Sequence, residues 1–403
     1  MPARSINLGS FALGLNNRLE WSRLGRTLAD RSKATYLYSA DNVDISANSY
    51  LRRRRGFARV IVGDCHSVWG DGGEGYAVID RVLTHLEPVA LGQTPLIADM
   101  PPVALAYARA PDGWVYWSNG QEIGRLQGTQ ARAHITPTPS PAPSAVPVAG
   151  ALPAGRYQVA FTADGQDGES AATMPVVVDL PDGGGIAFTG MTPDMRAYAT
   201  GPDGEVFNEV QGGDYLSLTN LGARAATILL APMPPGRALA VYGGSLLVAA
   251  GNLLCVSEPY NYGLMNPSRG YIPFPAPVTV VQPCEDGVYV AADKTYWLAG
   301  DILDTTAVTV LPFGALRGSS GFSPEQQFAY WQSPQGIVIA QPGGQVTTPQ
   351  NDALAFGGAA AGATWYRERD GMRHIVAARI DASPARAVSR GFRQSEIQRK
   401  AFP

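Results

Sequence analysis

One short phrase recurs along this sequence and restricts what the chain can fold into. A turn of small residues is followed by Gly-X-apolar-X-apolar, a second turn and another apolar run, with copies that begin at Asp112-Gly113, Gly243-Gly244, Asp286-Gly287, Gln335-Gly336 and Asp370-Gly371. Glycine supplies the positive φ that tight β-hairpin turns require. Repeated hairpins predict the blades of an all-β propeller, about six in number, because radially repeated sheets leave few exposed strand edges.

The composition agrees with a protein built from many short strands. The 403 residues include 46 glycines and 32 prolines, and 45% of all residues are hydrophobic. This length allows two or three domains with sizeable cores, and the turn-forming residues favour short strands. The sequence has no run of 18 apolar residues, and its first eight residues lack the pattern of a secretion signal. We therefore expect no membrane span and no passage through the general export route.

A change of composition in the middle of the chain predicts an inserted domain. A linker rich in proline, serine and threonine at residues 137–143 precedes short apolar strands, and a second proline-rich stretch at 232–236 follows them. This spacing is typical of a small immunoglobulin- or fibronectin III-like β-sandwich, which a surface loop of a rigid scaffold can accommodate. We therefore divide the chain into an N-terminal part of the propeller (1–135), linker and sandwich (136–235), a C-terminal part of the propeller (236–385) and an arginine-rich tail (386–403).

The sharpest electrostatic feature lies before the first blade. Residues 24–30 predict a short helix, and residues 39–46 predict a strand that turns and returns over residues 50–57. The returning strand carries Arg52, Arg53, Arg54 and Arg55. Clustered arginines can neutralise DNA phosphates, although about two of them at most share one face of a strand. The alternative is a solvated edge or a salt-bridged interface between subunits, so contact with a DNA channel and contact with a subunit both stay open.

The C-terminal tail is a second basic segment. It predicts an exposed arm that docks on a neighbouring protein. Its basic residues are Arg390, Arg393, Arg399 and Lys400.

The residues that catalysis or metal binding would require are scattered. The three cysteines, Cys65, Cys255 and Cys284, and the four histidines show no zinc-type spacing, so we expect buried thiols, no disulfide and no metal site. The glycine-rich stretches lack the GxxxxGK[ST] phosphate loop, no serine has a GxSxG elbow, and no carboxylate pair stands out for glycoside cleavage. We expect no cofactor. The net charge of −3 gives no global attraction to nucleic acid or acidic membranes.

Large aromatic residues recur at corresponding places in the repeats. We interpret them as side chains that fill the cores between blades, the alternative being a surface that binds sugars or stacks bases. They are Trp114, Tyr116, Trp117, Tyr296, Trp297, Tyr330, Trp331, Trp365 and Tyr366.

Several of these stretches resemble virion proteins of tailed phages. Residues 243–263, with their Ser257-Glu258-Pro259 phrase, and the stretches 266–274 and 286–300 are similar to podovirus tail-nozzle and packaged-DNA-stabilisation proteins. The opening Gly14-Leu15-Asn16-Asn17 and the later Arg54-Arg55-Gly56 resemble the start of those proteins. The resemblance implies a propeller that forms a ring, commonly a hexamer, below the portal and adaptor. Such a ring continues the DNA channel and helps retain the genome, while a fibronectin-like insert projects towards fibres or the host surface.

We therefore expect a non-enzymatic structural component of a phage tail, a nozzle or neck ring that is made in the host cytoplasm and resides in the virion. Its expected partners are copies of itself, the portal, the adaptor and other tail proteins, and packaged DNA in the lumen. The first alternative is a receptor- or carbohydrate-binding tail module. The second is a propeller enzyme that degrades envelope polysaccharide.

Overall fold

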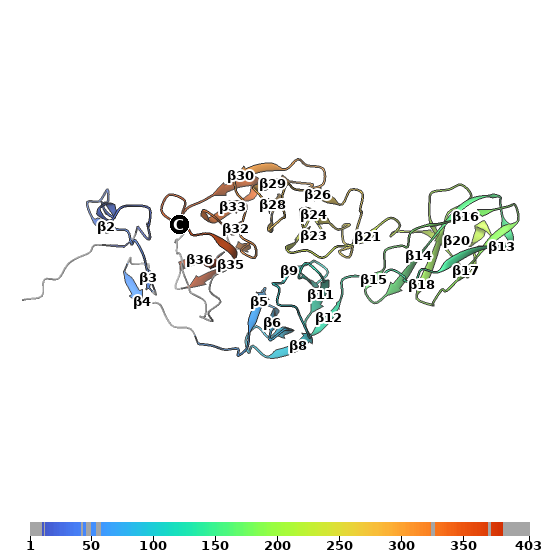
Figure 1. Ribbon diagram of the computed structural model, residues 1–403, viewed down its shortest axis with the longest axis horizontal. Helices are drawn as coiled ribbons and strands as arrows, with labels where there is room; N and C mark the ends of the chain where they lie inside the picture. Colours follow the sequence, from blue (N-terminus) through green and yellow to red (C-terminus); the bar gives the residue numbers. More distant parts are fainter. Residues whose placement is uncertain are drawn as a thin grey trace, which may run out of the picture. The chain divides into compact units, whose positions relative to one another are not determined.

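The computed structural model describes residues 10–11, 13–41, 43–45, 50–53, 58–323, 327–369 and 372–381. These residues form antiparallel sheets, turns and short 3-10 helices (Figure 1). The chain divides into two compact units, one made of Met1–His66 with Phe274–Pro403 and the other of Ser67–Pro273. No helix among the described residues is long and apolar enough to cross a membrane.

The unit Ser67–Pro273 is built mainly on three four-stranded antiparallel sheets. The first contains β5 (Cys65–Gly70), β6 (Gly75–Ile79), β7 (Val82–Leu86) and β8 (Gln93–Ile97). The second contains β9 (Ala106–Arg109), β10 (Val115–Ser118), β11 (Ile123–Gln127) and β12 (Gln130–Ala133). The third contains β22 (Leu239–Tyr242), β23 (Ser245–Ala250), β24 (Leu253–Val256) and β26 (Tyr271–Pro273). A short pair of strands flanks β22–β24 in the sequence: β21 (Ala231–Pro232) pairs with β25 (Leu264–Met265).

Alternate side chains of β10 stack these three sheets face to face. Val115 and Trp117 share a core cluster with Tyr76 of the first sheet. Tyr116, between them in sequence, belongs to the opposite cluster with Leu246 of the third sheet. Successive side chains of a strand point to opposite faces, so the middle sheet buries both faces against its neighbours. All three β10 residues are 5% exposed or less, which is the burial expected of a propeller blade.

The other unit repeats this arrangement with its own strands. One sheet contains β27 (Val280–Cys284), β28 (Gly287–Ala291), β29 (Thr295–Ala299) and β30 (Val308–Leu311). The next contains β31 (Gly321–Ser323), β32 (Phe328–Ser333), β33 (Gly336–Gln341) and β34 (Gln345–Thr347), with the helical turn η3 (Pro342–Gly344) before β34. A long two-stranded hairpin, β35 (Ala359–Arg369) with β36 (Met372–Asp381), completes the series.

Here β32 plays the part that β10 plays in the other unit. Its Trp331 packs in one cluster with Tyr289 and Trp297 of the preceding sheet. Its Tyr330 packs in the next cluster with Ile375 of the long hairpin. The predicted fold class is therefore confirmed: the chain is all-β and consists of stacked, meandering sheets of the propeller-blade type. Among the described residues this series comprises five four-stranded sheets and the two-stranded β35–β36 hairpin.

The turn glycines of the recurring phrase have two different physical reasons. Gly113 lies at φ 86° and Gly336 at φ 111°, which is the left-handed backbone expected of hairpin turns. Gly287 is different, because its φ is outside that region and a Cβ there would lie 2.3 Å from the Leu298 carbonyl oxygen and 2.6 Å from the Trp297 ring. At this copy the prediction of a positive φ was wrong, and close approach explains the glycine. The turn Asp370-Gly371 lies outside the described residues.

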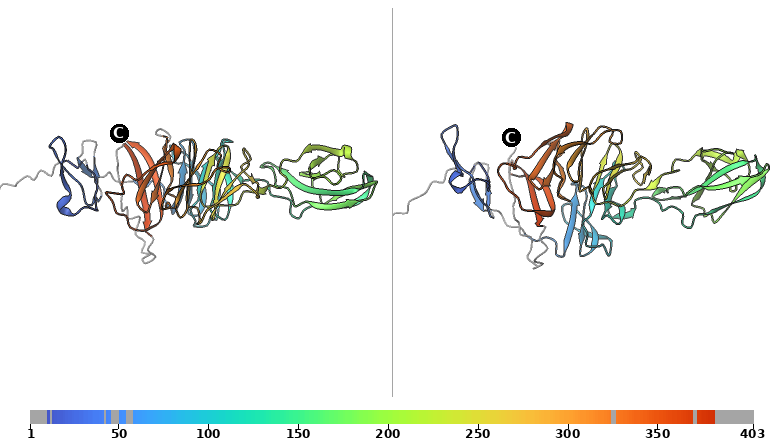
Figure 2. Two further views of the ribbon diagram at one scale, coloured as in Figure 1. Left: turned by 90° about the horizontal axis from the view of Figure 1, so that it is seen from above. Right: turned by 45° about the horizontal axis from the view of Figure 1, so that its top comes forward.

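The middle of the chain forms a β-sandwich of its own, green to yellow-green in Figure 2. One sheet pairs β13 (Ser144–Leu152) with β17 (Gly184–Thr189). The other contains β14 (Gly155–Gly165), β15 (Gly168–Glu169), β16 (Val176–Leu180), β18 (Met195–Ala199), β19 (Asn208–Val210) and β20 (Leu221–Arg224), with η2 (Leu218–Asn220) before β20. Leu152 and Ile186 from the first sheet and Phe161 from the second share one core. We call residues 144–230 the inserted module.

Contacts at residues 125–136 attach the inserted module to the sheet that precedes it in sequence. Arg125 of β11 forms an ion pair with Asp167 at 2.6 Å, and the Thr136 hydroxyl donates to the Gly168 carbonyl oxygen at 2.6 Å. Burial lowers the pKa of His134, which favours a neutral imidazole at this joint. Both polar contacts come from the single turn that joins β14 to β15.

The N-terminal segment has little core of its own. Residues 24–30 form no helix: the 3-10 turn η1 (Trp21–Arg23) is followed by β1 (Gly25–Thr27), which pairs with β2 (Lys33–Thr35). The helix prediction was wrong because this stretch has no N-cap and no apolar face to bury. The predicted strand and its return are present as β3 (Val43–Ile45) paired with β4 (Leu51–Arg53).

Candidate functional site

The described part of the predicted arginine run is exposed. Arg52 and Arg53 lie at the end of β4, opposite Asp44 and Val43 of β3. Because they are successive strand residues, they point to opposite faces and cannot act together on one surface. Arg54 and Arg55 lie outside the described residues, and so do the tail residues Arg390, Arg393, Arg399 and Lys400.

Sequence reasoning missed an aromatic surface in the same segment. Trp21 is 75% exposed, and its ring stacks on that of Tyr38 with centroids 4.9 Å apart and planes 24° apart. The Arg26 guanidinium lies 5.8 Å from the Tyr36 ring centroid. The signal in the sequence was a tryptophan and several tyrosines among arginines, in a stretch without the alternation of a blade strand. This surface offers planar rings and positive charge to a partner.

The exposed N-terminal segment is tied to the rest of its unit at Asn17 and Arg18. The Asn17 side chain donates to the Ala355 carbonyl oxygen at 3.0 Å and accepts from the Ala355 N–H at 2.7 Å. Arg18 Nε donates to the Leu354 carbonyl oxygen at 3.0 Å. These bonds hold one end of the segment in place while its rings and cations remain exposed.

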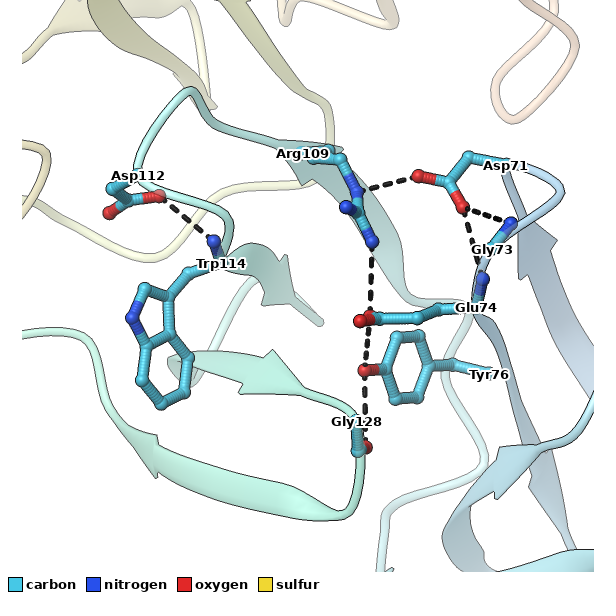
Figure 3. Close-up of polar contacts among 8 residues, drawn as sticks. All are labelled: Asp71, Gly73, Glu74, Tyr76, Arg109, Asp112, Trp114 and Gly128. Carbon is cyan, nitrogen blue, oxygen red and sulfur yellow. Dashed lines mark hydrogen bonds and ion pairs between the residues drawn. The ribbon is translucent and has the colours of Figure 1, made fainter.

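A second group of polar residues joins two blade sheets, as Figure 3 shows. Arg109 at the end of β9 contacts Asp71 Oδ2 through Nε at 2.5 Å and Glu74 Oε2 through a terminal nitrogen at 3.1 Å. The Tyr76 hydroxyl donates to Glu74 Oε2 at 2.8 Å and lies 3.2 Å from the Gly128 carbonyl oxygen. The group therefore links the β5–β6 turn, β9 and the β11–β12 turn.

The chemistry of this group is that of a structural clasp. Burial and the neighbouring Glu74 raise the pKa of Tyr76, so the phenol stays protonated as a donor. Arg109 balances part of the charge of the two carboxylates, and its side chain is 37% exposed. The arrangement holds sheets together; it holds no base aimed at an activated nucleophile.

The replacement Tyr76→Phe tests the clasp. It removes the hydroxyl that bridges two turns, and we expect the free energy of unfolding to fall by about 1 kcal/mol. Urea denaturation measures this loss. The matched control is Tyr260→Phe, because Tyr260 is 77% exposed; an equal loss in both variants would refute the structural role of the clasp.

Trp114, which Figure 3 draws with the clasp, has two arginines near its ring. Asp112 fixes its turn by accepting from the Trp114 N–H at 3.0 Å, as Figure 3 shows. Asp112 also accepts from the Tyr116 hydroxyl at 3.0 Å. The guanidinium carbons of Arg125 and Arg132 lie 4.6 and 5.5 Å from the ring centroid. Because Arg125 also pairs with the inserted module, Trp114 belongs to the joint described above.

The structure assigns most of the predicted aromatic residues to cores between sheets. The prediction is confirmed for five residues that lie in core clusters shared by two sheets, which are Tyr116, Trp117, Trp297, Tyr330 and Trp331. Tyr296 is also buried, with its ring against that of Phe274. Trp365 is the exception, because it is 55% exposed on β35 with Arg367 at 5.4 Å from its ring. The long hairpin packs one face, which carries Tyr366, against the core of the preceding sheet. Trp365 is exposed because it lies on the opposite face of the hairpin.

The cysteines depart from expectation at one position. Cys255 and Cys284 are buried thiols, as predicted, whereas Cys65 is exposed at the start of β5. None of the three takes part in a disulfide. Within the described ranges, no three histidine, cysteine or carboxylate residues come together as metal ligands.

Burial raises the pKa of Cys255 and of Cys284 to about 11. A raised thiol pKa contributes stability that is complete below the unfolded value near 9 and is lost as the pH rises through 11. We therefore expect the melting temperature to fall as the pH rises from 9 to 11.

Thiol labelling tests the burial of the cysteines. At pH 8 the native chain should show one thiol reactive towards dithionitrobenzoate, and the chain unfolded in guanidinium should show three. Three reactive thiols in the native chain would contradict this assignment.

Comparison with known proteins gives a likeness of shape. No protein-family model matches the sequence, and no curated protein matches it. The computationally designed Ika8 protein is similar at 13% identity over 78% of this chain and 93% of that chain, with a TM-score of 0.29. Virginiamycin B lyase from Staphylococcus aureus is similar at 12% identity over 78% of this chain and 91% of that chain, with a TM-score of 0.32. A nidogen/laminin complex is similar at 11% identity over 74% of this chain and 93% of that chain, with a TM-score of 0.25. Scores at this level carry no argument about function.

Proposed function

We propose that this protein is a non-enzymatic structural component of a phage tail, a ring of subunits in the nozzle or neck. The proposal joins the resemblance of several stretches to tail-nozzle proteins with what the side chains do. The expected neighbours are further copies of the chain, the portal, the adaptor and other tail proteins, and DNA in the lumen.

One observation carries this proposal. Most large aromatic residues of the blade sheets are buried, Tyr271 and Trp365 being exposed exceptions, while the N-terminal segment carries exposed aromatic and arginine side chains without a sheet core beneath them. Trp, Tyr and Arg are the residues that contribute most energy at protein interfaces. A rigid stack of sheets with such a segment attached is suited to holding neighbours.

Labelling of virions tests the location. Antibody fragments against the inserted module should bind the tail of purified particles in negative-stain images, and mass spectrometry should detect the chain in those particles. Particles that lack the chain, or labels confined to the head, would overturn the proposal.

A carbohydrate-binding role is the second candidate, and Trp365 is the observation that favours it. An exposed tryptophan with a cation on its ring can stack on a sugar. Glycan-array binding that saturates and that Trp365→Ala abolishes would support this role. A Trp365→Ala variant with unchanged binding would remove it.

A further inference from the structure

Residues 21–38 of the N-terminal segment expose the aromatic and arginine side chains that are common in protein-binding anchors. We call Trp21, Arg23, Arg26 and Tyr38 the N-terminal aromatic patch. Both rings are exposed, at 75% and 38%, and they already stack on each other. A pair of rings that is ordered before binding loses little further freedom in a complex. The patch is therefore prepared for a partner with an apolar and negatively charged surface.

The inserted module carries the opposite charge. Residues 144–230 contain three arginines, no lysine and ten aspartates or glutamates, a formal charge of 3 − 10 = −7. Residues 1–66 contain eleven basic and five acidic residues, a formal charge of 11 − 5 = +6. The near-neutral total of −3 hides these two opposed regions.

One edge of the module combines this charge with exposed apolar side chains. Among the described strands β16 forms a ladder with β14 alone. Met174, Val176 and Val177 are 84%, 41% and 42% exposed there. Asp179 and Asp182 are exposed on the same stretch. We call these five residues the β16 edge patch.

We propose that the N-terminal aromatic patch of one copy docks on the β16 edge patch of a second copy. The rings would cover Met174 and Val177, and the arginines would face Asp179, which shares the outward face of β16 with Val177, and the neighbouring Asp182. Two different surfaces of one chain that bind each other make a head-to-tail contact, which closes into a ring when its rotation allows. The inference rests on the proposed function, because it names the contact that builds the ring.

Charge reversal in pairs tests the contact on the full-length chain. Variant A carries Arg23→Glu and Arg26→Glu, and variant B carries Asp179→Lys and Asp182→Lys. Each alone should raise the protein concentration of half-assembly by about tenfold or more, because like charges then face each other. An equimolar mixture of A and B should restore assembly through the contacts that are again complementary. Mass photometry measures assembly of the wild-type chain, of A, of B and of the mixture.

Controls separate this contact from folding and from the proposed function. The double variant Arg224→Glu, Arg269→Glu changes the charge by the same amount as variant A at other exposed positions and should assemble normally. Circular dichroism melts should be unchanged for A and B, since the replaced side chains are exposed. If A or B forms rings as well as the wild-type chain, the docking contact is overturned and the proposed function is unaffected. If A forms intact rings but loses DNA binding, the N-terminal aromatic patch is reassigned to nucleic acid. A wild-type chain that forms no ring would count against the proposed function itself.

Discussion

Replacing Trp331 with alanine is expected to lower the free energy of unfolding by about 3–5 kcal/mol, the cost of deleting a fully buried large aromatic side chain. Trp331 has 0% exposure and lies in the cluster between two sheets, with the Tyr289 ring centroid at 5.4 Å. Alanine leaves a cavity that the paired strands on either side cannot close. Guanidinium denaturation followed by circular dichroism measures the loss.

The same replacement at Trp365 is the matched control. Trp365 is 55% exposed, so Trp365→Ala should change the stability by less than about 1 kcal/mol. Equal losses at the two positions would show that the blades do not stack through β32 as described.

The second large effect is expected at Gly287. A methyl group there would lie 2.3 Å from the Leu298 carbonyl oxygen and 2.6 Å from the Trp297 ring. The nearer atom belongs to the backbone of the paired strand β29, so it cannot move without breaking the ladder. Gly287→Ala should therefore cost about 3 kcal/mol, at the upper end of the usual range for overpacking. Thermal melting and urea denaturation check the loss.

Gly358→Ala is the control for that change, because a methyl group at Gly358 meets no atom within 4 Å. It should leave stability within about 1 kcal/mol of the parent chain, since alanine restricts the unfolded chain only slightly. A tolerant Gly287 would mean that the recurring phrase needs glycine only for its turns.

The blade architecture could be predicted from the sequence because it rests on local signals. The short apolar runs around Tyr116 and around Tyr330, with turn residues on either side, are typical of strands that bury both faces. Successive hairpins then pair with their neighbours in chain order, so the sheets follow without long-range information. The same reasoning placed the inserted module, whose proline-rich flanks and short strands are visible in the sequence.

The remaining features depend on contacts that no local pattern encodes. The stack of Trp21 on Tyr38 joins residues seventeen positions apart in a segment without periodicity. The clasp of Arg109 with Asp71 and Glu74 requires two sheets to meet first. Gly287 looked like an ordinary turn glycine, because its constraint comes from the Leu298 carbonyl oxygen and the Trp297 ring on the next strand.

The net charge of the whole chain conceals the opposite charges of two of its segments. A net charge of −3 predicts no global attraction to nucleic acid or acidic membranes, whereas the opposed charges of residues 1–66 and 144–230 favour the proposed contact between copies. Charge counted by segment is therefore more informative for this chain than charge counted over its full length.

Mass photometry of the purified full-length chain at micromolar concentration, with negative-stain images of the same sample, tests the central claim most directly. Assembly into a hexameric ring gives a species of six times 42.6 kDa, about 256 kDa, with a central opening in the images. A single species of 42.6 kDa under those conditions would contradict the view that this protein exists to hold copies of itself and their neighbours.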